Sequence, residues 1–239
     1  MIVGIVVALP EELGTLTSQK IAKGGCVFIT DTLVVGYSGA GANNAQAAAE
    51  RLITQGATRL ISWGCAAALS ASLKSGDLVL ADSLIDAEGT RLSLQSDWHL
   101  SSQKLLSNLR LIHVGSLAES HSIVDLAKDK QQLHQQTGAI ALDMESAAIA
   151  HVAGQHQLPF LAIRAIVDPA DMDLPKAISH ALNAQGDIVL GRLLAFIVRH
   201  PAELAGLIKL GLHFNAATNT LKYVAKQLND LSDLSNSNS

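Results

Sequence analysis

Apolar runs of four to eight residues, each bounded by glycine, proline or charged positions, recur along the chain and predict buried β-strands. These runs cover residues 2–9, 27–30, 32–37, 59–63, 77–81, 111–114, 139–142 and 159–166. Between several of them, apolar positions recur at helical spacing over residues 42–54, 101–109, 124–136 and 145–155. Strands that alternate with helices predict an α/β fold with a mixed, mostly parallel central sheet flanked by helices. The short gap between the second and third runs predicts one antiparallel hairpin.

The pattern changes after residue 169, where helical spacing dominates. It predicts one long helix over residues 175–199, which ends at His200-Pro201 because proline lacks a backbone N–H and restricts the residue before it. Residues 202–228 predict one or two further helices. Their apolar stripes are Leu204, Ile208 and Leu212, and then Leu221, Val224, Leu228 and Leu231. We therefore expect one α/β domain over 1–199, a C-terminal helical extension over 200–231 and a Ser/Asn-rich disordered tail over 232–239.

Composition excludes several classes of protein. Hydrophobic residues make up 49% and charged residues 16%, which suits a buried core and excludes general disorder. The net charge of −4 argues against non-specific nucleic-acid binding, and no apolar run reaches the ~18 residues that span a bilayer. The apolar start lacks the basic flank of a secretory signal, and Cys26 and Cys65 suit a reducing compartment, so we expect a cytoplasmic protein. The nine histidines show no metal-binding spacing, so no metal is expected.

Acidic residues follow the first predicted strand directly. Glu11 and Glu12 stand where ligands bind in open α/β sheets, beyond the carboxyl ends of the strands. Acidic residues are also common in the first turn of a helix, where they interact favourably with the helix dipole. Without other evidence, this structural role is enough to explain Glu11 and Glu12.

Two small-residue turns also follow predicted strands. Gly39 and Gly41 open the alanine-rich helix, where glycine allows close ligand approach and free N–H groups can bind a polar ligand. The turn lacks the third glycine of a dinucleotide site and the lysine of a P-loop, so the signal is weak alone. Cys65 and Ala66 follow Gly64 in a similar turn, for which tight helix–strand packing is an equal alternative.

The last two candidates lie near predicted strand ends. Asp143-Met144-Glu145 stands where a predicted strand ends and a predicted helix begins. Asp143 could serve there simply as the N-cap of the helix, which is the alternative to a functional role. Arg164 stands inside an apolar strand that ends in Asp168. A buried arginine needs a carboxylate or a ligand, and a structural ion pair with Glu145 is the alternative to a functional role.

Acids that converge at one end of a sheet suit cleavage of an N-glycosidic bond. The reaction passes through an oxocarbenium-like state and needs a proton donor, an activated nucleophile and a grip on the ribose hydroxyls. A buried carboxyl of raised pKa can donate the proton while a second carboxylate activates water. The logic parallels glycoside hydrolysis.

Together, these segments resemble the purine/uridine nucleoside phosphorylase family, on its nucleosidase side. The matching segments, in family order, are residues 4–12 (GIVVALPEE), 38–41 (SGAG), 64–69 (GCAAAL) leading to Gly76-Asp77, 143–145 (DME) and 164–168 (RAIVD). The resemblance implies that Glu12 activates the nucleophilic water and that Asp168 protonates the purine as general acid. It further implies that Met144 and Glu145 hold the ribose and that Arg164 orients these groups. It also implies a homodimer or larger homo-oligomer without a cofactor, with phosphate as co-substrate if the enzyme is a phosphorylase.

Residues 158–175 and the segment from His200 to Leu221 are similar to the hopanoid-associated branch of this family. That branch is linked to release of adenine from adenosylhopane, which implies a site that opens onto an apolar groove. The amphipathic extension is then expected to line that groove or to contact a membrane surface, with packing on the core or at a subunit interface as the alternative. Where family members often have Ser-Ala-Gly-Gly, this chain has residues 65–68 (CAAA), and a thiol donates hydrogen bonds poorly. His121 and Ser122 are the candidates for base recognition, with a solvated loop as the alternative.

Alternative functions stay open at this point. A phosphorylase would need cations near the first loop, which carries Glu11 and Glu12 instead, so water is favoured as nucleophile. A catalytically silent nucleoside- or lipid-binding protein would retain the same fold. A Rossmann dehydrogenase is disfavoured, because no Gly-x-Gly-x-x-Gly follows the first strand.

Overall fold

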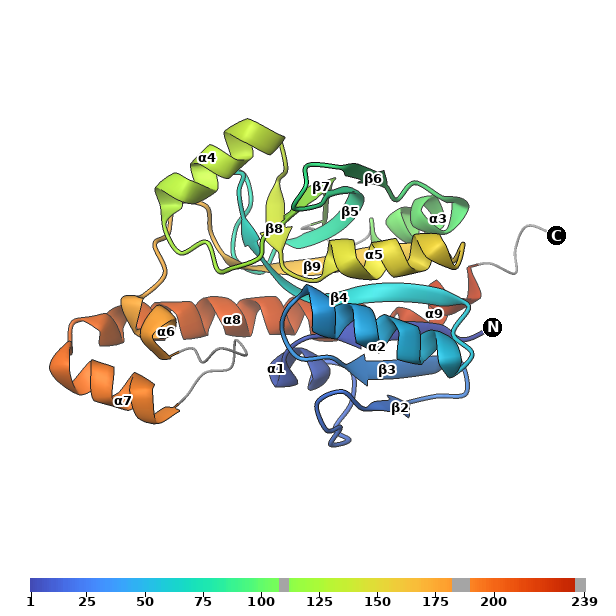
Figure 1. Cartoon of the computed structure of the whole chain (residues 1–239), viewed down its shortest axis with the longest axis horizontal. Helices are drawn as coiled ribbons and strands as arrows, with labels where there is room; N and C mark the ends of the chain where they lie inside the picture. Colours follow the sequence, from blue (N-terminus) through green and yellow to red (C-terminus); the bar gives the residue numbers. More distant parts are fainter. Residues whose placement is uncertain (108–111, 182–189, 235–239) are drawn as a thin grey trace.

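The computed structural model describes residues 1–107, 112–181 and 190–234 (Figure 1). Its strands are β1 (Val3–Val7), β2 (Cys26–Phe28), β3 (Leu33–Tyr37), β4 (Arg59–Ala68), β5 (Leu78–Ile85), β6 (Arg91–Ser93), β7 (Ile112–Glu119), β8 (Ala141–Asp143) and β9 (Phe160–Asp168). Its helices are α1 (Pro10–Leu13), α2 (Ala42–Thr54), α3 (Asp97–Leu106), α4 (Ala127–Thr137), α5 (Ser146–Gln155), α6 (Lys176–Ala181), α7 (Leu190–Arg199), α8 (Glu203–Ala225) and α9 (Leu228–Asp233). No helix among these described residues is long and apolar enough to cross a membrane.

The strands form one mixed sheet, which confirms the predicted α/β class. Its order in the described chain is β2-β3-β1-β4-β8-β7-β5-β6, and β9 pairs with both β4 and β5. Strand β9 therefore closes a ring through β4, β8, β7 and β5. The pairs β1–β3, β1–β4, β4–β9, β5–β7 and β7–β8 are parallel, and the predicted hairpin β2–β3 is antiparallel.

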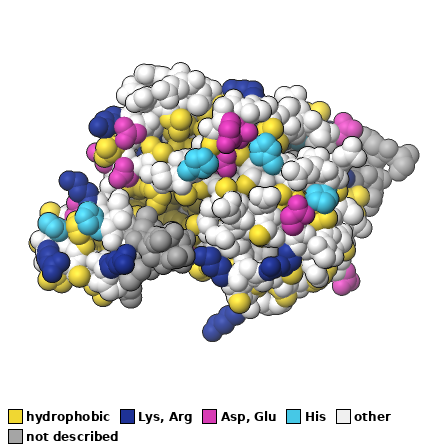
Figure 2. Space-filling view, viewed as in Figure 1, with side chains coloured by type: hydrophobic (Ala, Val, Ile, Leu, Met, Phe, Trp, Pro, Cys, Tyr) yellow, Lys and Arg dark blue, Asp and Glu magenta, His cyan; other side chains and the backbone are white. Residues whose placement is uncertain are grey.

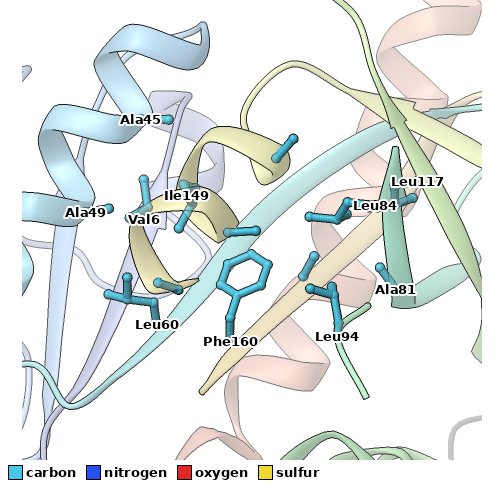
Figure 3. Close-up of a cluster of buried hydrophobic side chains, with 14 of the residues drawn as sticks. Val6, Ala45, Ala49, Leu60, Ala81, Leu84, Leu94, Leu117, Ile149 and Phe160 are labelled. Atoms are coloured by element: carbon cyan, nitrogen blue, oxygen red, sulfur yellow. The ribbon is translucent and has the colours of Figure 1, made fainter. Parts of the chain in front are cut away.

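Helices cover both faces of this sheet, which is why central strands such as β1 and β9 are buried and largely apolar. Every residue of β1 is buried, and successive residues such as Ile5 and Val6 enter two different hydrophobic clusters. One cluster packs under α2 and α5, where Ala45, Ala49 and Ile149 meet the sheet (Figure 3). The other packs against α1, α3, α8 and α9.

The region after residue 175 differs from the prediction of one long helix. The ring centroids of His180 in α6 and Phe196 in α7 lie 4.3 Å apart. A continuous helix would separate these residues by ~24 Å, because each residue adds 1.5 Å. Two helices therefore pack side by side, and residues 182–189, which join them, lie outside the described chain.

The C-terminal helices are part of the core. Leu221 and Val224 of α8 are buried against the sheet, and α8 contacts β9 extensively. Ser232 is buried in α9, so the disordered tail predicted from residue 232 is wrong for this residue and for Asp233. The rest of that tail, residues 235–239, lies outside the described chain.

The other differences between the predicted and the observed elements concern mainly where strands and helices begin and end. Strands β4, β5 and β7 extend beyond their predicted ends, because small or polar residues continue pairing where the apolar run stops. The short strand β6 was not predicted, because its three residues do not form an apolar run. Helix α3 begins at Asp97, with the Ser96 side chain accepting the His99 N–H as an N-cap, rather than at the predicted residue 101. Residues 108–109 of that predicted helix lie outside the described chain.

Candidate active site

A cavity of about 770 Å³ lies beyond the carboxyl ends of β1, β3, β7, β8 and β9 and beside the end of β4. Glu12, Glu145 and Asp168 all line it, although they come from distant parts of the sequence. Figure 2 shows a hollow with hydrophobic side chains between the α4 region and the helices α6 to α8. The structure therefore brings the three acids together, as the sequence predicted.

Glu12 is held in place by backbone N–H groups. Its Oε2 accepts hydrogen bonds from the N–H groups of Ala8 and Leu9 at 3.0 Å each, and its Oε1 accepts one from Cys65 at 2.8 Å. The side chain is 2% exposed, and this burial raises the pKa of Glu12, while the Arg164 charge and the three N–H groups oppose the rise. Glu12 thus closes the N-terminus of α1 and also faces the cavity.

Arg164 and Asp143 form the buried centre behind the cavity. Arg164 Nε donates a hydrogen bond to Asp143 Oδ2 at 2.6 Å. Its Nη2 donates hydrogen bonds to Ser62 Oγ at 2.6 Å and to Ser146 Oγ at 3.1 Å. Asp143 Oδ1 also accepts the N–H groups of Glu145 and Ser146, which fixes the start of α5. Asp143 therefore fixes the turn that leads into α5 and is also the counterion of the arginine.

Glu145 lies at the point where α5 begins. Its Oε1 accepts a hydrogen bond from the Gly41 N–H at 2.9 Å, and its Oε2 is 3.9 Å from the nearest Arg164 nitrogen. Burial and the charge of Asp143 raise the pKa of Glu145 to about 7, although Arg164 opposes the rise. The neighbouring Met144 lines the same cavity.

Asp168 ends β9 at the opposite side of this group. Its Oδ2 lies 2.6 Å from Nζ of Lys130, which comes from α4. Burial raises the pKa of Asp168 to about 6, and Lys130 limits that rise. A carboxyl with such a pKa is a proton donor near neutral pH.

Most of the other predicted site residues also line the cavity. Gly41, Cys65, Ala66, His121 and Ser122 are among them. Burial raises the pKa of the Cys65 thiol well above its usual range, so this residue is a neutral thiol at the cavity wall.

Two of the predicted site residues, Gly39 and Arg164, do not line the cavity. A Cβ at Gly39, where φ is +81°, would overlap the Lys23 side chain, so this glycine serves the turn rather than the cavity surface.

The sequence did not single out several residues of the site as candidates. Gly64 is the clearest, because a Cβ there would overlap Glu12 and lie 2.5 Å from an Arg164 nitrogen. The remaining ones are Ser62 and Ser146 on Arg164, Lys130 on Asp168, and the apolar lining residues Leu174, Ile178, Leu210 and Phe214.

The fold is that of nucleosidases of known structure. The 5′-methylthioadenosine/S-adenosylhomocysteine nucleosidase of Helicobacter pylori is similar over 97% of both chains, with 19% identity and a TM-score of 0.72. Futalosine hydrolase of the same organism is similar over 97% of both chains, with 18% identity and a TM-score of 0.71. The nucleosidase of Neisseria meningitidis is similar over 95% of this chain and 98% of its own, with 19% identity and a TM-score of 0.71. At this coverage, the long helix α8 lies within the matched part of the chain.

The sequence model of the Phosphorylase superfamily matches residues 2–197. The chain belongs to this superfamily, which confirms the family assignment made from the sequence motifs.

Proposed function

We propose that this protein hydrolyses the N-glycosidic bond of a purine nucleoside. The observation that carries the proposal is the shared cavity, in which three buried carboxyl groups meet in different surroundings. The names of the similar structures, which are purine nucleosidases and a futalosine hydrolase, support the same reaction class. Different surroundings give the three groups different tasks.

Asp168 is the general acid in this proposal. It donates its proton to a ring nitrogen of the purine, so that the electron pair of the breaking bond to C1′ leaves with a neutral base. Its pKa of about 6 keeps part of the carboxyl protonated near neutral pH.

Glu12 positions the water that attacks C1′ and accepts a proton from it. Its two oxygens are fixed by three backbone N–H groups, so the carboxylate needs no reorganisation during the reaction. Glu145 accepts hydrogen bonds from the ribose hydroxyls, and Met144 packs under the sugar. Arg164 keeps Asp143 and the start of α5 in place.

The charge of the cavity favours water over phosphate as the nucleophile. Among the described residues that line the cavity there is no arginine or lysine. The acidic residues that line it are Glu12, Asp125, Asp143, Glu145 and Asp168. The hydrogen-bonding groups of Arg164 face Asp143, Ser62 and Ser146. A phosphate ion would therefore meet no arginine or lysine among the described residues of the cavity wall.

An apolar wall indicates the class of nucleoside. The cavity is lined by Leu174 and Ile178 from the α6 region and by Leu210 and Phe214 from α8. This wall suits a large apolar 5′ group, and with the hopanoid-branch resemblance it supports adenosylhopane as the substrate. Release of adenine would then leave a ribosyl-hopane.

A lipid-linked substrate is most accessible at a membrane, and we extend the proposal to peripheral contact with an anionic lipid surface. An apolar stripe is exposed on α7 and α8, and it comprises Leu194, Val198, Leu204, Ile208 and Leu212. Arg199 and Lys209 accompany the stripe on the same helices. Apolar side chains with neighbouring cations are typical of helices that bind anionic lipid headgroups.

Vesicle sedimentation tests the membrane contact. We expect binding to anionic but not to neutral vesicles, and loss of binding in a Leu204→Ser/Ile208→Ser variant. Unchanged sedimentation of that variant would refute the contact. A halved solution mass of the variant would instead make the stripe a subunit interface, in line with the homo-oligomer that the family resemblance predicts.

Adenine release from a panel of nucleosides tests the main proposal. We expect turnover without phosphate, best with apolar 5′ groups, and a loss of about 10²-fold or more in Asp168→Asn. Asp171→Asn, at an exposed acid three residues later, is the matched control and should retain activity. Strict dependence on phosphate would establish a phosphorylase, and tight nucleoside binding without turnover would establish a binding protein.

A further inference from the structure

Helix α4 carries a buried lysine against the cavity acid Asp168. Lys130 has 0% of its side chain exposed, and its Nζ lies 2.6 Å from Asp168 Oδ2. Nζ also donates hydrogen bonds to the carbonyl oxygens of Pro169, at 3.0 Å, and Met172, at 2.7 Å. Two of the three N–H donors of the ammonium group are therefore used by carbonyl groups just after Asp168, and its charge is paired with Asp168 itself.

This lysine is unusual for the helix that carries it. Lys130 is the buried residue of α4, whose other positions are mostly polar and exposed or half-buried. A buried ammonium is costly unless it is paired and hydrogen-bonded, and an apolar side chain would anchor the helix without that cost. The charge at this position therefore calls for a role beyond packing.

Further contacts fix the same segment against α4. Asp173 Oδ1 accepts the Ala127 N–H at the start of the helix at 2.7 Å, and the Leu174 N–H donates to the Asp125 carbonyl at 2.7 Å. Together with the Lys130 contacts, these hydrogen bonds attach both ends of the segment 168–174 to the start of α4 and the residues just before it. The position of Asp168 is thereby determined by a helix that is distant from β9 in the sequence.

We propose that Lys130 is the positioning residue for Asp168, and that it holds Oδ2 so that Oδ1 carries the proton delivered to the leaving base. Within the described residues neither oxygen of Asp168 accepts a hydrogen bond, and Oδ2 is the oxygen that forms the ion pair with Nζ of Lys130. This inference rests on the proposed function, because it assigns Lys130 to the general acid of that reaction.

The pairing also sets the pH range of the acid. Burial raises the pKa of Asp168, and the close contact and charge of Lys130 lower it again, while Asp173 raises it. Without Lys130 the carboxyl would keep its proton to higher pH. Because the acid acts when protonated, the alkaline limb of kcat would then move upward in pH.

The test compares Lys130→Met, which removes charge and hydrogen bonds, with Lys130→Gln, which keeps a donor without the charge. Lys128→Met, at an exposed position of the same helix, is the matched control. We expect both Lys130 variants to shift the alkaline limb of kcat to higher pH and to lower kcat by about 10-fold or more at its plateau, with the larger loss in Lys130→Met. Lys128→Met should match the wild type.

A double-mutant cycle separates positioning from general structure. If Lys130 acts through Asp168, adding Lys130→Met to Asp168→Asn should lower kcat less than about twofold further. An alkaline limb that stays in place, with equal losses in both backgrounds, would overturn the role of Lys130 and leave the proposed function intact. Full activity of Asp168→Asn alone would overturn both.

Discussion

Arg164 forms a short, hydrogen-bonded ion pair with Asp143 and a longer ion pair with Glu145. The Nε of Arg164 lies 2.6 Å from Asp143 Oδ2, whereas its closest nitrogen lies 3.9 Å from Glu145 Oε2. The sequence had suggested a possible pair with Glu145. Because Asp143 neutralises the arginine from the far side, Glu145 keeps its carboxyl for the cavity and for the Gly41 N–H.

The pairing predicts unequal costs for removing the two acids. Asp143→Asn leaves the buried Arg164 without its counterion and should lower the free energy of unfolding by about 3–5 kcal/mol. Glu145→Gln should change it by less than about 1 kcal/mol near pH 5, where Glu145 is protonated in the folded protein. Urea unfolding at that pH measures both. Equal losses in the two variants would contradict the assignment of Asp143 as the counterion.

Glu145 should also make the wild type less stable as pH rises. Its folded pKa of about 7 lies above the ordinary value of 4.5, so its contribution to stability is complete below pH 4.5 and is lost as pH rises through 7. Glutamine does not titrate. Between about pH 4 and pH 8 the wild type should therefore lose roughly 3 kcal/mol relative to Glu145→Gln.

Urea midpoints of both proteins across this pH range measure the difference. A stability difference that stays constant with pH would mean that Glu145 is ionised in the folded protein throughout.

Gly64 should tolerate no side chain. A Cβ would overlap Glu12 and lie 2.5 Å from an Arg164 nitrogen, and both groups are held by several hydrogen bonds. We expect Gly64→Ala to lower kcat by about 10²-fold, because a displacement of ~1 Å at such a site has that effect. Gly154→Ala is the control, since nothing lies within 4 Å of its Cβ, and alanine should stabilise α5 by up to ~1 kcal/mol. Normal turnover by Gly64→Ala would show that Glu12 can move freely.

The sequence predicted the fold class and the acids that line the cavity for a physical reason. Buried strands must be apolar, so Glu12, Arg164 and Asp168 stood out against their surroundings, and the alternation of strands and helices predicted which ends of the strands meet. The helix over α2 was predicted at its observed bounds, because its alanine-rich face is regular.

The parts that were missed depend on distant contacts. Lys130 looked like one charge in a polar helix, and only the return of β9 beside α4 buries it. Gly64 resembled any small residue in a turn, because its neighbours Glu12 and Arg164 come from other elements. The prediction of one helix over 175–199 failed because local spacing does not reveal that His180 and Phe196 stack.

Phe214 should distinguish nucleosides by their 5′ groups. It lies on α8 and lines the cavity with other apolar residues. We expect Phe214→Ala to lower kcat/KM by about 10–200-fold for nucleosides with a long apolar 5′ group, the range that apolar pocket contacts supply. For adenosine the change should be less than about threefold, because adenosine leaves the apolar wall empty.

Tyr223→Ala, at an exposed aromatic position of the same helix outside the cavity, controls for general effects on α8. Steady-state kinetics with adenosine and a 5′-alkylthio series of increasing chain length make the comparison. If Phe214→Ala lowers kcat/KM equally for every member of the series, the residue supports the fold of the site, and the apolar wall does not select the substrate.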